Sequence, residues 1–332
     1  MTTRADTTTT PSRTHSLRKV LGLAGATAVG VLLALQSRIN GTLGVRMHDG
    51  IAAAVISFGS GLVVLVVCTA VLPKARNGVR RVVAEVRSGG GLRWWQCLGG
   101  VCGGYLVISQ GTAAIELGVA LFTVTVVAGQ VSSGLLVDRL GLGPAGPQPV
   151  TFPRALGAGL AVVAVLVAVS AKLGTAQASW LVLLPLFAGI GLAWQAAVNG
   201  RVQQTSRSSV MAATLNFGTG TLALLVVFAV EVALRGLPQS APPEPWLYIG
   251  GFLGIFVIGG AVALVRHTGV LLLSMGMIAG QLLGALLLDL LAPVPGQTVP
   301  MSTVAGVGLT LVAVCIAALP DRAVRRPRDL GR

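Results

Sequence analysis

The chain has 332 residues, of which 54% are apolar and only 10% are charged, and its mean hydropathy is +0.83. A soluble domain carries about a quarter charged residues, so this composition excludes a soluble protein and indicates an integral membrane protein. Long continuous apolar runs exclude a β-barrel, whose strands alternate in polarity, and predict an all-α membrane fold. The net charge of +14 does not indicate nucleic-acid binding, because the basic residues lie at the termini and in short connectors.

Apolar runs of helical length divide the chain from end to end. Residues 1–17 are rich in Thr, Ser and Arg, and we expect a disordered cytoplasmic tail. The next run resembles a signal peptide, but it lacks a small-x-small cleavage site and matches an internal segment, so we expect it to be retained. A bilayer core of about 30 Å needs about 20 apolar residues per helix. This length predicts ten transmembrane helices, at 18–39, 51–72, 93–114, 117–138, 153–172, 179–199, 209–231, 246–265, 269–291 and 302–319, followed by a basic cytoplasmic tail at 320–332.

The chain also repeats its own sequence. In one register, at a spacing of 159 residues, the matched pairs include Gln36 with Gln195, Asn40 with Asn199 and Phe58 with Phe217. In a second register, at 151 residues, they include Gly103 with Gly254, Gln130 with Gln281 and Asp138 with Asp289. The registers differ where the first half has the longer charged connector. This pattern predicts a duplication with repeats at 18–172 and 179–319.

Basic residues predict the orientation of the helices. With the N-terminus inside, cytoplasmic segments hold 20 of the Lys and Arg residues and outer loops hold four. Lys and Arg favour the cytoplasmic side, so we expect both termini in the cytoplasm. Each repeat has five helices, an odd number, so the second enters the membrane from the opposite side. The sequence therefore predicts two inverted five-helix repeats (5+5), as in many secondary transporters with substrate sites between the halves.

Polar residues inside apolar segments need a partner or a function. The candidate substrate-binding residues are the repeated amides Gln36, Gln195, Gln130, Gln281, Asn40 and Asn199. For Gln36 and Gln195, the alternative is hydrogen bonding between helices that holds the halves together. Each Asn precedes a glycine, so we expect these pairs to end their helices as C-caps. The two mid-segment glutamines, Gln130 and Gln281, are the best candidates for lining a central cavity.

Three acidic residues, Glu116, Asp138 and Asp289, are candidates for coupling transport to protons. Glu116 lies in a very short link between two helices, and it would carry a proton only if that link enters the membrane. Asp138 precedes Arg139, so an interfacial ion pair is the alternative for this acid. Asp289 has no adjacent cation in the sequence and is therefore the more interesting member of its pair.

Catalytic and cofactor signatures are absent from the sequence. It contains no HExxH, no GxSxG with a plausible partner set and no Walker A motif, so we expect neither an enzyme nor an ATP-driven pump. The histidines are isolated. The cysteines form no CxxC motif, so we expect no metal site, disulfide framework or other cofactor.

The paired Q-x3-N-G and F-G-x-G segments, with AGQ ending at Gln130 and at Gln281, resemble the drug/metabolite transporter superfamily, in particular its YdcZ-like inner-membrane exporters. That branch includes five-helix proteins, and this chain resembles two of them fused. The resemblance implies a multi-pass transporter of the bacterial inner membrane that exports a small polar metabolite or drug-like molecule by alternating access, often with proton coupling.

The chain departs from one relative of that branch. Small multidrug resistance proteins use an acidic residue in their first helix, and neither the first nor the sixth predicted helix has one here, which argues against their exchange mechanism. The alternative function is a membrane scaffold or lipid-handling protein without a soluble substrate. The sequence leaves the substrate, coupling ion, direction and oligomeric state open.

Overall fold

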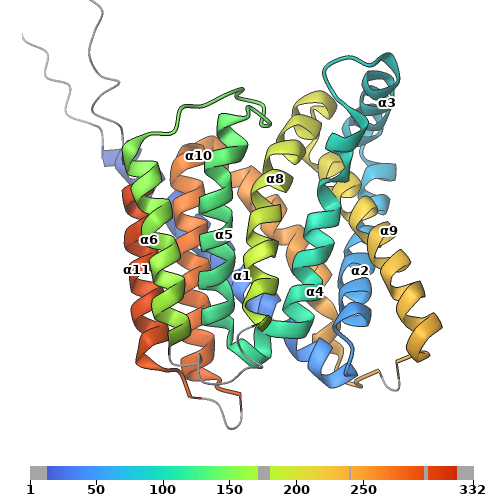
Figure 1. Ribbon diagram of the computed structural model, residues 1–332. Coiled ribbons are helices and arrows are strands. Elements are labelled where there is room, and N and C mark those ends of the chain that lie inside the picture. The colour runs from blue at the N-terminus through green and yellow to red at the C-terminus, as the bar shows by residue number, and fades with distance from the viewer. Residues whose placement is uncertain (1–12, 171–179, 239–240, 295–297, 320–332) are drawn as a thin grey trace, which may run out of the picture.

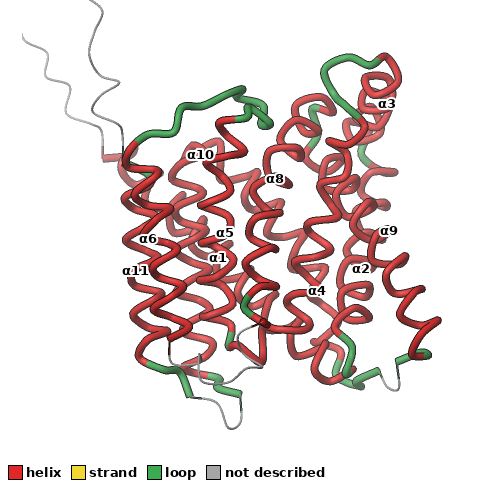
Figure 2. Tube along the Cα trace, in the orientation of Figure 1, coloured by secondary structure: helices red, strands yellow, loops and turns green. Residues whose placement is uncertain are grey.

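The computed structural model describes residues 13–170, 180–238, 241–294 and 298–319, which are almost entirely helical and include no strand (Figures 1 and 2). The helices are α1 (Arg13–Met47), α2 (Gly50–Val71), α3 (Pro73–Ser88), α4 (Gly99–Leu117), α5 (Val119–Arg139), α6 (Phe152–Val169), α8 (Leu183–Ser206), α9 (Ser209–Arg235), α10 (Gly250–Leu291) and α11 (Met301–Ala317), with 3-10 turns η1 (Trp94–Leu98) and η3 (Pro245–Ile249). The two tails expected at 1–17 and 320–332 lie wholly or mainly outside the described residues.

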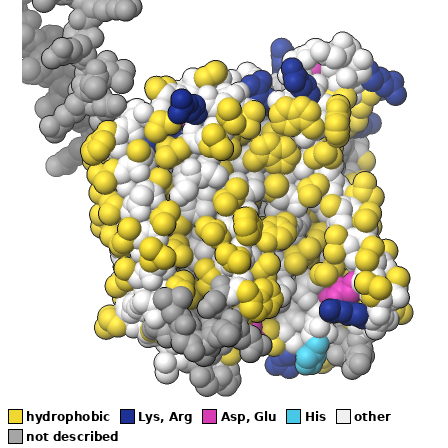
Figure 3. Space-filling view, in the orientation of Figure 1, with side chains coloured by type: hydrophobic (Ala, Val, Ile, Leu, Met, Phe, Trp, Pro, Cys, Tyr) yellow, Lys and Arg dark blue, Asp and Glu magenta, His cyan; other side chains and the backbone are white. Residues whose placement is uncertain are grey.

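The surface has the polarity of a membrane protein. In the described residues, eight helices are long and apolar enough to cross a bilayer, and two shorter apolar helices cover Pro245–Ala261 and Met301–Ala317. Hydrophobic side chains cover the middle of the face in Figure 3, and Lys and Arg gather mainly at the end that carries α3. We call this end the α3 end. Charged side chains avoid lipid, so an apolar belt with charged ends is the distribution that a bilayer requires.

The helix α10 changes direction along its length. As one straight helix, its 42 residues would span about 63 Å, twice the thickness of a bilayer core. We call the part of α10 up to Gly260 its first limb and the part from Gly276 its second limb. Along the first limb, successive glycines lie against α1 residues of decreasing number: Gly250 against Asn40, Gly254 against Gln36 and Gly260 against Val29. Along the second limb, successive glycines lie against α1 residues of increasing number: Gly276 against Ala26, Gly280 against Thr27 and Gly284 against Ala34. The two limbs therefore run in opposite directions along α1 (Figure 1), in agreement with the separate segments expected at 246–265 and 269–291.

The expected helix ends at Asn40 and Asn199 are wrong. Both α1 and α8 continue for seven residues, to Met47 and Ser206. The next residue in each case, His48 or Arg207, has a left-handed backbone with φ of 54° or 52°. The true boundary is thus a left-handed residue followed by a side chain that caps the next helix. These equivalent caps are Asp49, which accepts from the amides of Ile51 and Ala52, and Ser208, which accepts from that of Met211.

The charged connector of the first half forms the helix α3, which the apolar pattern does not predict. Pro73 occupies its first turn, and Gly89, with φ of 67°, ends it in a left-handed conformation. Its small apolar face, including Gly78 and Val82, is buried, and α3 packs on α8 and α9. Its basic residues are exposed at the α3 end.

Candidate transport site

Equivalent glycines of the two halves make equivalent contacts with the opposite half. A Cβ on Gly61 would lie 2.4 Å from Phe217, and a Cβ on Gly220 would lie 2.4 Å from Phe58. The same exchange relates the contacts of Gly30 with the backbone of Met277 and Gln281 to those of Gly189 with Val126 and Gln130. It also relates Gly103, beside Gln195, to Gly254, beside Gln36. The packing of the halves therefore follows a pseudo-two-fold relationship.

Phe58 and Phe217 lie at the centre of this relationship. Their rings stack with centroids 4.7 Å apart and planes inclined by 22°. Both side chains are buried. Because the two residues are counterparts in the repeat and contact each other, the pseudo-two-fold axis passes between their rings.

A buried chain of amides connects α1 to its neighbours. The Nε2 atom of Gln36 donates to the carbonyl of Gly250 at 2.9 Å, which links α1 to α10. Asn40 Nδ2 donates to Gln110 Oε1 at 2.7 Å, and Gln110 Nε2 donates to Ser37 Oγ at 2.9 Å, which links α1 to α4. The hydrogen bond of Gln36 thus agrees with the alternative role expected for this residue, which is to hold helices together. Sequence reasoning missed Gln110, because its counterpart at 151 residues is Ala261 and a search for repeated amides passes over it.

A second amide cluster lies on α8 and α9 and is more open. Gln195 Nε2 and Asn199 Nδ2 both donate to Asn216 Oδ1, each at 3.0 Å. Both donors belong to partly buried residues, whereas Asn216 is buried. Gln195 Oε1 is buried and accepts no hydrogen bond from the described residues, and the same is true of Asn40 Oδ1 in the first cluster. Asn216 was also missed, because its counterpart is Ser57 rather than another amide.

Gln130 borders two cavities near the α3 end. The first, of about 260 Å³, lies among α5, α6, α10 and α11 and is also lined by Gly134, Arg154 and Ser274. The second, of about 280 Å³, shares Gln130 and Gly134 and extends past Asp138 toward α8. Its counterpart Gln281 instead lies where α10 packs against α1 at Gly30. Of the repeated pair, Gln130 therefore borders the cavities, whereas Gln281 is packed against α1.

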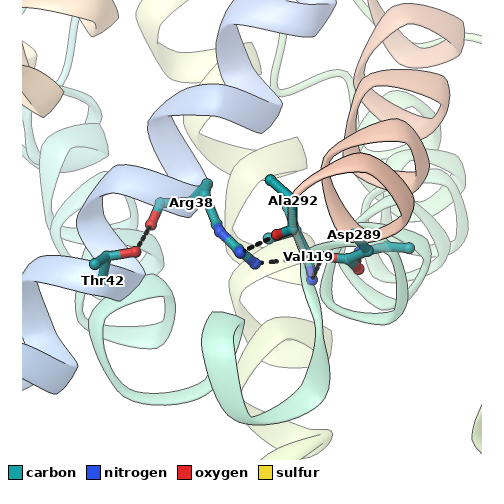
Figure 4. Close-up of polar contacts among 6 residues, drawn as sticks. Arg38, Thr42, Val119, Asp289 and Ala292 are labelled. Atoms are coloured by element: carbon teal, nitrogen blue, oxygen red, sulfur yellow. Dashed lines mark hydrogen bonds and ion pairs between the residues drawn. The ribbon is translucent and has the colours of Figure 1, made fainter. Parts of the chain in front are cut away.

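At the opposite end, a buried ion pair joins three helices (Figure 4). Asp289 of α10 accepts hydrogen bonds from the first amides of α5, those of Val119 at 3.1 Å and Ala120 at 2.7 Å. Arg38 of α1 places its Nη1 atom 3.6 Å from the same carboxylate and donates through Nη2 to the carbonyl of Ala292. The cavity beside Asp289 measures only about 20 Å³. Asp289 therefore has a cation partner that is distant in sequence.

The other two candidate coupling acids lie in different surroundings. Asp138 pairs with Arg154 of α6 and not with its neighbour Arg139, so the expected partner is wrong. Both members of that pair are partly exposed, beside the second cavity. Glu116 does not lie in the link between the helices, as the sequence predicts, but in the last turn of α4, where its side chain is exposed. The three acids do not form one site, since Glu116 and Asp289 lie at the end opposite to the α3 end and Asp138 lies at the α3 end.

The described residues contain no cluster of His, Cys, Asp or Glu that could hold a metal ion. The four cysteines, Cys68, Cys97, Cys102 and Cys315, are free thiols.

The fold gives the class of the protein, and similarity to known proteins gives its family. The repeated halves, the apolar belt and the helical packing define an integral membrane protein built from two related halves. A family model described as "Putative inner membrane exporter, YdcZ" matches residues 21–167 and again residues 180–316. The chain belongs to this YdcZ family, as the repeated motifs indicated.

Known structures agree with the fold. A solved structure described as "Crystal structure of protein" is similar to 94% of this chain and 99% of its own length, with a TM-score of 0.51 and 16% sequence identity. This likeness concerns the fold. No curated protein matches the chain.

Proposed function

We propose that the protein is a secondary active transporter that exports a small polar metabolite or drug-like molecule across the bacterial inner membrane by alternating access. Its ten membrane segments, with the two limbs of α10 counted separately, form two inverted five-helix repeats. The observation that carries the proposal is the exchange of equivalent contacts around Phe58 and Phe217. Inverted repeats of this kind provide two arrangements related by the pseudo-two-fold axis, one open to each side of the membrane.

The cavities at the α3 end support a substrate path on that side. This end carries most of the basic residues, so we assign it to the cytoplasm. The cavities that share Gln130 are then open to the cytoplasm, and the end at Asp289 is closed to the outside. Cavities of about 260 and 280 Å³ are slightly smaller than typical drug-sized pockets of about 300–1,000 Å³. This size favours a small metabolite over a bulky drug.

The amides divide into two proposed roles. Gln130, which borders both cavities, is the proposed substrate contact in this state, and Gln195, whose Oε1 is buried without a hydrogen-bond partner among the described residues, is a proposed contact in another state. Gln281 is the proposed counterpart in the opposite state. Gln36 and Asn40 are engaged with other helices and hold the packing. Among the acids, Asp289 is the proposed coupling residue, because it is buried and contacts both α5 and α1.

A cavity-filling substitution tests this function against a closely matched control. Gly134 lines both cavities, and Gly159 is exposed on α6; a Cβ on either would meet no atom within 4 Å. Cells that overproduce the wild type, Gly134→Phe or Gly159→Phe at equal membrane levels are compared for compounds in the growth medium. We expect a compound enriched by the wild type and by Gly159→Phe but not by Gly134→Phe.

Equal export by Gly134→Phe would exclude these cavities as the path. Failure of the wild type to enrich any compound, in either direction of transport, would favour the scaffold or lipid-handling alternative. A pH gradient imposed on vesicles that contain the protein then tests protons as the coupling ion, with Asp289→Asn as the uncoupled variant.

A further inference from the structure

We infer that Arg38 and Asp289 form the external gate of the transport path, a contact that must separate before the outer end can open. The inference rests on the proposed alternating-access function. The contact joins the three elements whose separation would open that end: α1 through Arg38, the second limb of α10 through Asp289, and α5 through the amides of Val119 and Ala120 (Figure 4).

The gate is buried and its carboxylate is fully engaged. The side chain of Asp289 is 9% exposed and that of Arg38 is 16% exposed. Both carboxylate oxygens accept from α5, at the helix end where unpaired amides and the helix dipole favour a negative charge. The guanidinium of Arg38 adds a positive charge to the same carboxylate. Because hydrogen bonds lose strength steeply with distance and angle, a shift of α5 away from α10 breaks both amide contacts together, and a shift of α1 away from α10 breaks the contacts of Arg38.

The backbone at Gly118 makes this arrangement possible. Gly118 is the one residue between α4 and α5, and its φ of 85° is a conformation that side-chain-bearing residues rarely adopt. A Cβ at this position would also lie 3.1 Å from Asp289 Oδ2. Since the link is so short, holding the start of α5 also holds the end of α4. The gate therefore restrains α4 in addition to the three helices that it contacts directly.

The two ends of the molecule differ as a one-sided gate requires. Beside Asp289 there is about 20 Å³ of space, room for about one water molecule, while cavities of about 260 and 280 Å³ lie near the other end. Asp138, the counterpart of Asp289, borders one of those cavities in a pair that is 41% and 30% exposed. The counterpart of Arg38 is Ala197, so the second half has no equivalent cation. The buried pair thus belongs to the closed end alone.

Cysteine labelling tests the gate without any knowledge of the substrate. Thr303 is buried beside Asp289 in the small cavity, so Thr303→Cys in a background without the four native cysteines reports opening to the outside. A membrane-impermeant maleimide is added to intact cells. We expect Asp289→Asn and Arg38→Gln each to raise the labelling rate by about tenfold, the change that corresponds to about 1.4 kcal/mol of closing free energy. The control Arg235→Gln, which removes an ion pair with Glu231 elsewhere, leaves the rate unchanged.

Unchanged labelling in both gate variants, with normal gel-filtration profiles, overturns the gate. An equal rise in the Arg235→Gln control also overturns it, because general loosening would then be the cause. If a gate variant does not fold, Arg38→Lys takes its place, since it keeps the charge and loses the planar contact; a rise in labelling supports the gate and an unchanged rate contradicts it.

A second probe separates the gate from the proposed function. Ala196 is exposed and lines the cavity of about 280 Å³, so Ala196→Cys, labelled with the same maleimide in inside-out membrane vesicles, reports the opposite end. If alternating access is correct, the gate variants lower the labelling at position 196 while they raise it at position 303. A rise at 303 with no fall at 196 supports the gate and contradicts alternating access.

Discussion

Phe58 and Phe217 are counterparts in the repeat and stack on each other, with ring centroids 4.7 Å apart. We expect Phe58→Ala and Phe217→Ala each to lower the free energy of unfolding by about 3–5 kcal/mol, because each leaves a cavity at the centre of the packing. The double variant should show a coupling of about 0.5–1.5 kcal/mol from the lost stacking. Unfolding in detergent measures these values. The control is Phe252→Ala, whose ring is 47% exposed; purely additive losses would contradict direct coupling.

The close approach of the halves depends on two equivalent glycines. A Cβ on Gly100 would lie 1.8 Å from the carbonyl oxygen of Asn216, and a Cβ on Gly251 would lie 1.8 Å from that of Ser57. We expect Gly100→Ala and Gly251→Ala to destabilise the protein by about 1–3 kcal/mol or more, because backbones must move apart. In the control Gly259→Ala, the new Cβ would have no atom within 4 Å, so this variant should be neutral or slightly stabilising. Thermal unfolding of the three variants compares them; equal stability of all three would show that the contact is not tight.

The repeated glutamines should respond differently to substitution. Gln36→Ala removes the buried side-chain hydrogen bond to the carbonyl of Gly250, and we expect a loss of about 1 kcal/mol in stability. Gln195→Ala leaves Asn216 with its second donor, Asn199, so we expect a smaller loss of stability and a larger loss of transport. Melting temperature and transport are measured on the same preparations. The reverse order would assign Gln36 to the substrate and Gln195 to packing.

The two mid-helix glutamines test the substrate path. Gln130→Ala removes the amide that borders both cavities, and Gln281→Ala removes its counterpart beside α1. We expect normal membrane insertion and at least about a tenfold loss of transport in each, equivalent to about 1.4 kcal/mol of lost interaction. Full transport by both variants would remove these residues from the path.

Ion pairs at the two ends should differ in their contribution to stability. Arg154→Gln breaks a partly exposed pair with Asp138, and we expect a loss of at most about 1 kcal/mol that decreases further in high salt. Arg38→Gln leaves the buried carboxylate of Asp289 without its cation, and we expect about 3–5 kcal/mol. Denaturation at low and high salt compares them. Similar losses for the two variants would contradict the difference in burial.

The sequence predicts most helices well and their ends poorly. An apolar run of about 20 residues is sufficient to place a membrane helix, because lipid leaves the backbone few alternatives. The Asn-Gly pair at position 40 predicts a helix end, but the Asn40 side chain donates a hydrogen bond to Gln110 and the helix continues to Met47. The true signal, a left-handed His48 before the capping Asp49, is weak in sequence. The search for long apolar runs does not find α3, because this helix is amphipathic and rich in charged residues.

The repeat identified which polar positions to consider but not their partners. It drew attention to Asp289, yet Arg38 lies 251 residues away and its counterpart is Ala197, so no pattern joins the two. Gln110 and Asn216 lack an amide counterpart, and a search by symmetry cannot find them. Contacts between residues that differ in the two halves are fixed by tertiary packing, which a single sequence does not display.

The exchanged packing has an evolutionary consequence. Because α1 lies along both limbs of α10, the first five helices lack a complete core without the last five. A five-helix chain of this kind would need a second copy inserted the other way up, and every substitution would then appear at both ends of the assembly. Fusion into one chain removes that restriction. One half can then carry Arg38 and Gln110 while the other carries Ala197 and Ala261, so the two ends of an originally symmetric assembly are free to specialise.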